Sequence, residues 1–472
     1  MKTSLKFSAL CLGLGLAQSA QATVYFDREY DPLPLFTLQV MLPVGSLSKD
    51  PVEAAALSLY AELIEDGTET LEKQAYQDVL TGYGASVDFS VGRETSAWSL
   101  SFPIIEGRDY MPLLNLLREN WSRPRVNQSA FDNAKAKTQA QLTSSLDQDM
   151  TLASLAGRRF VGVQDFKLYP IFMEGLKSVT LDSLKKVVQT RVRAQQEVWA
   201  GYVGPKSQED LAMDVVKTVF AEQGEIKVGA LDRSLVKSPS FASDKPIAKH
   251  AIIVEKPGRT QTIVFVNGVF RQFPGNMQEE LALHFGGHIL GFSGLGSYFG
   301  DEIRNKRGLA YTVSPVQQFY LGKPAVGFLT NPVREKNAEA LEVIADLLKS
   351  AYGEADVFKV LADDVWQRQW QSFRFGHILD NSSVTARLAL RQSVVEGTLS
   401  PELARSKPSS WRATRDDLTK YFGEAWSNAS QVIVVVGDSK ELKPLLEKNF
   451  PDYKIKVIAL KDSLLQKAYE TP

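Results

Sequence analysis

Histidine is scarce in this 472-residue sequence, and its placement excludes one kind of metal site. The four histidines are His250, His284, His288 and His377, so no histidine precedes position 250. Catalytic zinc is commonly held by two His side chains and a Glu. A site of that composition cannot be built from the first half of the chain.

Cysteine is also nearly absent. The single Cys11 lies in an apolar, small-residue run, Phe7–Ala17, which follows two lysines and precedes Ala20-Gln21-Ala22. This order is typical of a secretory signal peptide with an A-x-A cleavage site, so we expect residues 1–22 to be removed. The mature chain would then contain no thiol and no disulfide. Export without disulfides suits a periplasmic protein.

Excess charge and long hydrophobic runs are missing as well. Lys and Arg number 54 and Asp and Glu number 55, a formal net charge of -1. This balance gives no electrostatic footprint for nucleic acid. After the leader, no apolar run reaches the roughly 18 residues of a membrane-spanning helix, so we predict no membrane span in the mature chain.

What the sequence does contain is a weak internal duplication. Segments of one kind recur in the same order in both halves: an apolar strand pattern, a glycine turn and a Thr-capped helix start. The paired segments are Phe36–Leu42 with Gln261–Phe270, Gly84 with Gly308, and Thr180–Leu184 with Thr414–Leu418. The offset is 308 − 84 = 224 at the glycines and 414 − 180 = 234 at the threonines. Loop insertions explain such a drift.

The duplication predicts two lobes of the α+β class. We place the first lobe at residues 23–228, a polar linker rich in Ser, Pro and Lys at 229–249, and the second lobe at 250–472. Two similar lobes joined by a linker of that length can face each other across a cleft. Such a cleft suits an extended ligand.

Two stretches carry a resemblance to a known family. Ser58–Thr68, followed by Gly84-Ala85, resembles the beginning of a pitrilysin/insulinase-type zinc metallopeptidase. Gly291–Gly296, followed by Arg307–Tyr311, resembles the second half of the same family and is the more specific match. The resemblance implies two homologous lobes, each a mostly antiparallel sheet packed with helices, as in the mitochondrial processing peptidase.

The zinc motif of that family is degenerate here. Active members carry His-x-x-Glu-His on a helix, with a further Glu ligand some 70 to 80 residues later. The two His bind one zinc from one helix face, and the intervening Glu is the general base. The corresponding positions are Ser58, Ala61 and Glu62, and the downstream helix at Ser129–Ser145 contains no Glu. We therefore expect no catalytic residue and no cofactor in this chain.

Arg307 and Tyr311 are the candidate substrate-binding residues. The resemblance implies that an Arg and a Tyr at this spacing hydrogen-bond a backbone carbonyl of the substrate, and both side chains are suitable donors. An alternative stays open from the residues alone. Arg307 could pair with a local acid, Asp301 or Glu302, while Tyr311 packs at the start of a strand.

The family also contains two-subunit bacterial enzymes in which one chain binds zinc and the other carries the Arg/Tyr pair. This sequence resembles the second kind. The resemblance implies a non-catalytic, substrate-binding subunit, inactive alone, whose partner is a zinc-bearing peptidase subunit and whose substrate is a peptide or unfolded polypeptide. The alternative is a catalytically dead scaffold or peptide-binding protein of the same fold.

His284 and His288 provide the one competing metal signal. Four residues apart, they have the spacing of a zinc-binding pair, and Asp363 or Asp364 could supply a third ligand. However, Gly287 occupies the general-base position, and glycines weaken the helix that would present the pair. Packing between helices is the simpler interpretation of these two histidines.

Overall fold

The computed structural model describes residues 23–46, 48, 50–145, 148–160, 168–220, 225–229, 249–271, 273–320, 323–380 and 382–459. Its first sheet has the strand order β3-β4-β2-β5-β1-β6. The strands are β1 (Thr23–Tyr30), β2 (Leu35–Leu42), β3 (Ser86–Val91), β4 (Ser96–Pro103), β5 (Glu197–Gly204) and β6 (Glu225–Val228). Strand β1 runs parallel to β5 and β6, and the other pairs are antiparallel.

The second sheet repeats this topology. Its order is β12-β7-β11-β8-β10-β9, formed by β7 (Lys249–Glu255), β8 (Ile263–Val269), β9 (Ala310–Tyr320), β10 (Lys323–Pro332), β11 (Ser430–Gly437) and β12 (Lys454–Ala459). Strand β7 is parallel to β11 and β12, and the remaining pairs are antiparallel. Each strand of the second sheet thus corresponds to the strand numbered six lower in the first sheet, from β7 with β1 to β12 with β6. The predicted α+β class with two homologous lobes is confirmed.

Local sequence signals place the helix ends where the duplication predicts them. Thr180 and Thr414 both form capping boxes, with Ser183 and Asp417 respectively. In such a box the side chains satisfy backbone N–H groups that have no partner inside the helix. Gly84 and Gly308 both adopt the left-handed conformation, with φ of 63° and 57°, which glycine adopts without steric penalty.

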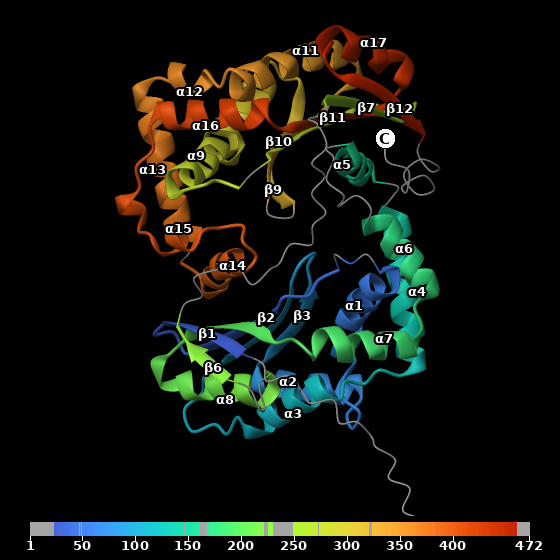
Figure 1. The fold of residues 1–472 in the computed structure, drawn as a ribbon, viewed down its shortest axis with the longest axis vertical. Helices are drawn as coiled ribbons and strands as arrows, with labels where there is room; N and C mark the ends of the chain where they lie inside the picture. The colour runs from blue at the N-terminus through green and yellow to red at the C-terminus, as the bar shows by residue number, and fades with distance from the viewer. Residues whose placement is uncertain are drawn as a thin grey trace, which may run out of the picture.

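Helices cover one face of each sheet and form the two main cores (Figure 1). The first lobe uses α1 (Pro51–Leu63), α2 (Lys73–Tyr83), α3 (Met111–Ser122), α4 (Gln128–Ser145), α6 (Leu168–Ser178), α7 (Leu181–Val187) and α8 (Glu209–Phe220). The second uses α9 (Met277–Gly287), α10 (Tyr298–Gly300), α11 (Asn337–Leu348), α12 (Val357–Val360), α13 (Asp363–Asp380), α15 (Pro401–Arg405), α16 (Arg415–Ser427) and α17 (Ser439–Asn449).

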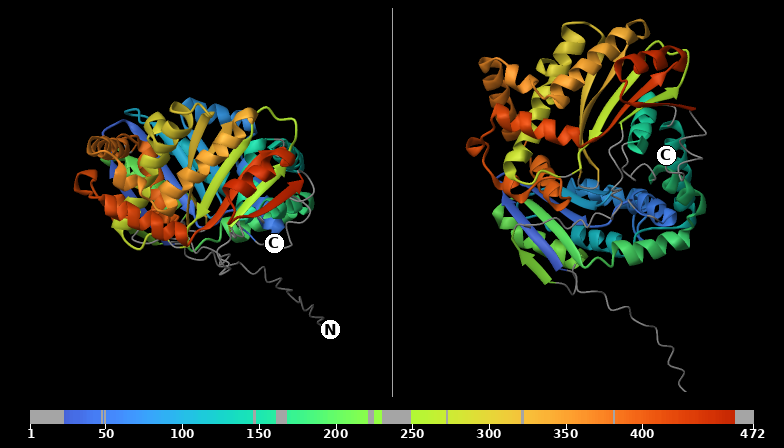
Figure 2. Two further views of the ribbon diagram at one scale, coloured as in Figure 1. Left: turned by 90° about the horizontal axis from the view of Figure 1, so that it is seen from above. Right: turned by 45° about the horizontal axis from the view of Figure 1, so that its top comes forward.

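Two helices lie against the opposite lobe. Helix α5 (Asp149–Phe160) belongs to the first half of the chain, yet it packs on the second sheet against β8 and β11. Helix α14 (Val384–Val395) belongs to the second half and packs on the first sheet against β2 and β5. Figures 1 and 2 show the teal α5 beneath the upper sheet and α14 above the lower one. The two helices are offset by 384 − 149 = 235 residues, so they are repeat equivalents.

Buried apolar side chains hold both helices in place. Leu152 and Ala156 of α5 pack with the second sheet, and Val384 and Leu388 of α14 pack with Trp199 of the first. Full burial of a side chain such as Leu or Val contributes about 1.5–3 kcal/mol. The exchanged helices therefore form a substantial part of the contact between the lobes.

Ion pairs also hold the two exchanged helices: α14 contributes arginines to its pairs, whereas α5 contributes an aspartate. Arg387 of α14 contacts Glu29 at 2.8 Å and also Asp31, and Arg391 contacts Glu29 at 2.6 Å. On α5 the acid is on the helix instead: Asp149 accepts a hydrogen bond from Lys256 Nζ at 2.6 Å and is also paired with Arg259.

Helix α1 begins at an aspartate cap, and two predicted segments lie outside the described residues. Asp50 caps α1 by accepting a hydrogen bond from the Val52 N–H. Glu53, in the first turn, accepts a hydrogen bond from Arg191 at 2.7 Å. The predicted signal peptide and nearly all of the 229–249 linker lie outside the described residues. In the described part of the chain, no helix is both long and apolar enough to cross a bilayer.

Candidate functional site

The degenerate zinc positions lie on α1 where that helix faces α4. Ser58 is half-buried, and its hydroxyl donates a hydrogen bond to the Ala54 carbonyl, 3.3 Å away. Ala61 supplies only a methyl group. Glu62, half-buried, is the one side chain of the three with a strong metal-binding atom. The three positions therefore lie within about one turn of helix α1, but only one of them carries a carboxylate.

A lysine ammonium group contacts that carboxylate. Lys137, on α4, donates a hydrogen bond from Nζ to Oε2 of Glu62. The bond to Glu62 raises the pKa of Lys137, which is therefore charged at neutral pH. Lys137 lies 137 − 62 = 75 positions after Glu62. This lies within the roughly 70 to 80 residues that the sequence resemblance implies for a third metal ligand.

These residues do not fit a zinc ion. A cation already neutralises Glu62, and neither Ser58 nor Ala61 offers an imidazole or carboxylate. Within the residues that the structure describes, no group of three or more His, Cys, Asp or Glu side chains could hold a metal.

The same region borders the free edge of the first sheet. Strand β3 ends the sheet in the described residues, and its Phe89 ring meets Tyr60 of α1 edge-to-face with 5.4 Å between centroids. Asp88 of β3 lies close enough to Glu65 to influence its titration: burial chiefly, then Asp88 and Glu62, raise the pKa of Glu65. An edge strand presents unpaired backbone N–H and C=O groups, so an extended peptide could pair here.

Arg307 and Tyr311 lie in the second lobe, at the beginning of edge strand β9. Arg307 Nη1 donates to the Glu302 carbonyl oxygen at 2.9 Å and also contacts the Glu302 carboxylate. The local ion pair considered from the sequence therefore exists. Tyr311, in contrast, is 76% exposed rather than packed into the core, and the Arg304 guanidinium stacks over its ring at 4.4 Å.

The two sets of candidate residues are not brought together. Ser58 and Glu62 belong to the first lobe, whereas Arg307 and Tyr311 belong to the second, and no hydrogen bond or ion pair joins the sets within the described ranges. Both Arg307 and Tyr311 are nevertheless accessible from solvent.

His284 and His288 are packed between helices. The His284 ring nitrogen Nδ1 lies 2.9 Å from Gln317 Nε2 on β9. Gly287 makes room for this contact, because a Cβ there would lie 2.4 Å from Gln317 Oε1. Burial, together with the smaller effect of nearby His377, lowers the pKa of His284 to about 4. His288 packs against Phe373, with 5.6 Å between ring centroids.

The acids considered as third ligands are engaged elsewhere. Asp363 pairs with Arg415 at 2.8 Å, and Asp364 pairs with Arg368 at 2.6 Å. Both lie in the first turn of α13, which brings Phe373 rather than a carboxylate to His288. The arrangement supports a packing role for the histidine pair.

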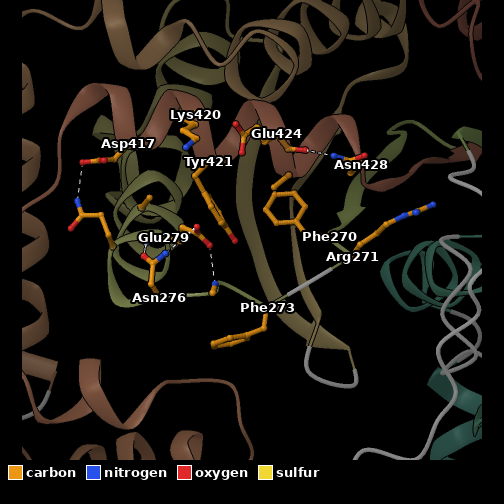
Figure 3. Close-up of a pocket in the computed structure, with 14 residues that line it drawn as sticks. Phe270, Arg271, Phe273, Asn276, Glu279, Asp417, Lys420, Tyr421, Glu424 and Asn428 are labelled. Atoms are coloured by element: carbon orange, nitrogen blue, oxygen red, sulfur yellow. Dashed lines mark hydrogen bonds between the residues drawn. The ribbon is translucent and has the colours of Figure 1, made fainter.

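A pocket that the sequence did not indicate lies between α9, α16 and the end of β8 (Figure 3). Its volume is about 780 Å³, and its lining includes Phe270, Phe273 and Tyr421. Ligand pockets commonly have volumes of about 300–1,000 Å³. No motif marks this pocket, because its walls come from segments about 150 residues apart (421 − 270 = 151).

Comparison with known proteins identifies the fold. No protein-family model matches the sequence, and no curated protein matches it. The crystal structure of a peptidase M16 inactive domain from Pseudomonas fluorescens superposes with a TM-score of 0.69 over 89% of this chain and 96% of that chain, at 19% identity. The fold is that of the M16 peptidases.

Two proteases also match this structure. A protease from Helicobacter pylori gives a TM-score of 0.67 at 16% identity, covering 87% of this chain and 96% of that one. The periplasmic protease PqqL from Escherichia coli gives 0.66 at 12% identity, covering 86% of this chain but 43% of that one. The predicted resemblance to the pitrilysin/insulinase (M16) family is confirmed at the level of the fold.

Proposed function

We propose that this chain is the non-catalytic, substrate-binding subunit of an exported M16-type zinc peptidase. The observation that supports the proposal is the Glu62–Lys137 ion pair, at positions that the sequence resemblance relates to metal ligands, in a fold shared with a peptidase M16 inactive domain. A zinc-bearing partner subunit of the same family would supply the metal and the general base. This chain would supply contacts to a peptide or unfolded polypeptide.

The exposure of Arg307 and Tyr311 supports the substrate-binding role. Two neighbouring polar side chains that reach solvent at the beginning of an edge strand can donate hydrogen bonds to a peptide carbonyl. Glu302 holds the Arg307 guanidinium in one orientation and leaves Nη2 without a bond from that acid. Preorganised donors of this kind lose little side-chain entropy on binding.

The experiment is reconstitution with a zinc-bearing chain that contains an intact His-x-x-Glu-His motif. The mixture should cleave quenched-fluorescent peptides in a chelator-sensitive reaction, whereas either chain alone should not. Arg307→Ala should lower kcat/KM at least tenfold, because a hydrogen bond from a charged donor contributes about 1.5–3 kcal/mol. Arg368→Ala, an exposed arginine on α13, is the matched control and should leave kcat/KM unchanged.

An unchanged kcat/KM in Arg307→Ala would show that the assigned role is wrong. Chelator-sensitive cleavage by this chain alone, free of other peptidases, would overturn the whole proposal.

A second candidate is a catalytically dead scaffold or peptide-binding protein. The engagement of Arg307 with Glu302 favours it. A scaffold would bind its partner or a peptide without changing the rate of any cleavage, and Arg307→Ala would affect only stability. The reconstitution assay separates the two functions, since only the first predicts rate enhancement on mixing.

A further inference from the structure

The pocket of the second lobe is built from aromatic walls and a polar rim. Phe270 and Phe273 line it from the end of β8, and Tyr421 projects into it from α16, as Figure 3 shows. The Tyr421 ring meets Phe270 edge-to-face at 5.9 Å, and Phe273 meets Phe319 of β9 at 5.9 Å. Phe273 is half-buried, so part of its ring remains available to a ligand.

The hydroxyl of Tyr421 is buried and has no hydrogen-bond partner among the described residues. Burial, together with the nearby carboxylates Glu279 and Glu280, raises the pKa of Tyr421. The phenol is therefore protonated and offers a donor. A buried polar atom left without a partner costs about 1–3 kcal/mol, so an acceptor brought by a ligand would relieve that penalty.

The polar groups of the rim fall into two sets. The Glu279 carboxylate accepts hydrogen bonds from the Gly275 N–H and the Asn276 side-chain amide, and the Asp417 carboxylate accepts one from the Thr414 N–H. These contacts belong to the helix starts and are not available for a ligand.

The second set is free. Arg271, Lys420 and Glu424 also line the pocket. The Glu424 backbone carbonyl accepts hydrogen bonds from Ser427 and Asn428, but in the described part of the chain the charged groups of the three side chains have no hydrogen bond or ion pair with another side chain. With Glu279 and Asp417 included, the rim has two cations and three carboxylates, a net formal charge of 2 − 3 = −1. A strongly charged ligand gains little from such a rim, whereas a neutral polar one can bond to it.

We propose that this pocket binds one aromatic side chain of a peptide together with an adjacent backbone carbonyl. The aromatic side chain would pack between Phe270, Phe273 and Tyr421, and the carbonyl oxygen would accept a hydrogen bond from the Tyr421 hydroxyl. The proposal rests on the proposed function and deepens it. It gives the substrate a second contact on the second lobe, besides the region of Arg307.

A peptide fits this pocket better than an isolated hydrophobic molecule does. Aromatic pairs in edge-to-face geometry contribute about 0.5–1.5 kcal/mol beyond the area they bury, which favours Phe, Tyr or Trp over aliphatic side chains. The unsatisfied phenol needs an acceptor close to that ring, and the backbone carbonyl of the same residue is such an acceptor. A plain hydrocarbon would leave the hydroxyl unsatisfied.

The test uses the full chain and the probe N-acetyl-phenylalaninamide, with N-acetyl-alaninamide as the comparison. Saturation-transfer NMR should detect binding of the aromatic probe, and titration should give a Kd lower than that of the alanine analogue. Tyr421→Phe should weaken the probe about threefold to tenfold, because it removes one hydrogen bond and keeps the ring. Phe273→Ala should weaken it about twofold to tenfold.

Phe375→Ala is the matched control, because Phe375 is a 60% exposed phenylalanine on α13 outside the pocket lining. It should leave the Kd unchanged, and thermal unfolding should verify that each variant is folded. Absence of saturation transfer to the probe, equal binding of the alanine analogue, or an equal Kd in Tyr421→Phe and Phe273→Ala would each overturn the proposal. The reconstitution assay fails or succeeds independently, because Arg307→Ala does not alter the pocket.

Discussion

Lys137 on α4 and Glu62 on α1 form an ion pair at positions that the sequence resemblance relates to the metal ligands of the family. Both side chains are partly exposed, so the pair itself contributes little to stability. Its main effect is on the ability of Glu62 to bind a cation. A fixed ammonium neutralises the one available carboxylate and repels a divalent cation. Both helices therefore contribute to the poor fit of this region to a metal ion, besides the absence of histidine.

Tight zinc binding should require substitutions in both α1 and α4. The variant with Ser58→His, Ala61→Glu, Glu62→His and Lys137→Glu should bind close to one zinc per chain, since it provides two imidazoles and a carboxylate ligand. The measurement is elemental analysis after dialysis.

The matched control keeps Lys137 and carries only the three α1 substitutions. It should bind zinc at least tenfold more weakly, because the third ligand is missing and an ammonium faces the site. Equal zinc content in the two variants would contradict the role given to Lys137.

Arg387→Ala should loosen the contact between the lobes. The substitution leaves Asp31 without its arginine and leaves Glu29 paired with Arg391 alone, and loss of a hydrogen bond to a charged group costs about 1.5–3 kcal/mol. Urea unfolding should show this loss in the free energy of unfolding. Arg368→Ala, which breaks only an exposed pair on α13, should change the free energy of unfolding by less than about 0.5 kcal/mol. Similar values for the two variants would refute a special role for Arg387.

Gly157→Ala should destabilise the chain although it replaces glycine within a helix. A Cβ at Gly157 of α5 would lie 2.6 Å from the Phe265 ring of the second sheet, and overpacking of this kind costs about 1–3 kcal/mol. Gly82→Ala in α2, where a Cβ meets nothing within 4 Å, should instead stabilise the chain by about 0.5–1 kcal/mol. Differential scanning calorimetry should give Tm shifts of opposite sign, and a higher Tm for both variants would exclude the close packing described for α5.

His284 should make stability fall as the medium becomes acidic. Its folded-state pKa of about 4 lies below the ordinary histidine value, so its contribution is complete above about pH 6.5 and is lost progressively towards pH 4. This corresponds to about 2 kcal/mol between pH 7 and pH 5. Urea unfolding of His284→Asn should show a pH dependence smaller by that amount. An undiminished pH dependence in this variant would show that His284 is not held neutral.

Much of the fold could be predicted from local signals. The capping threonines Thr180 and Thr414 and the turn glycines Gly84 and Gly308 act on their immediate neighbours. Their physical effect is local, so the sequence displays it directly. The strand patterns and the α+β class with two lobes follow in the same way.

What depends on distant neighbours could not be predicted. Lys137 is an ordinary surface lysine until α4 brings it to Glu62. The pocket at Tyr421 needs the end of β8 beside α16. Helices α5 and α14 gave no sign that each would pack on the other lobe, because an apolar helix face does not specify which sheet it covers. For Arg307, the sequence suggested both a substrate contact and a local pair, and the structure contains the pair.

The exchange of α5 and α14 has the form that two identical chains would produce around a twofold axis. An ancestral homodimer with swapped helices, joined later by a gene fusion, would yield this architecture. Separating the halves would then expose an apolar sheet face in each. We therefore expect neither half to be stable without the other. Divergence was left free to act on surfaces away from the swap, such as the region around Glu62 and Lys137.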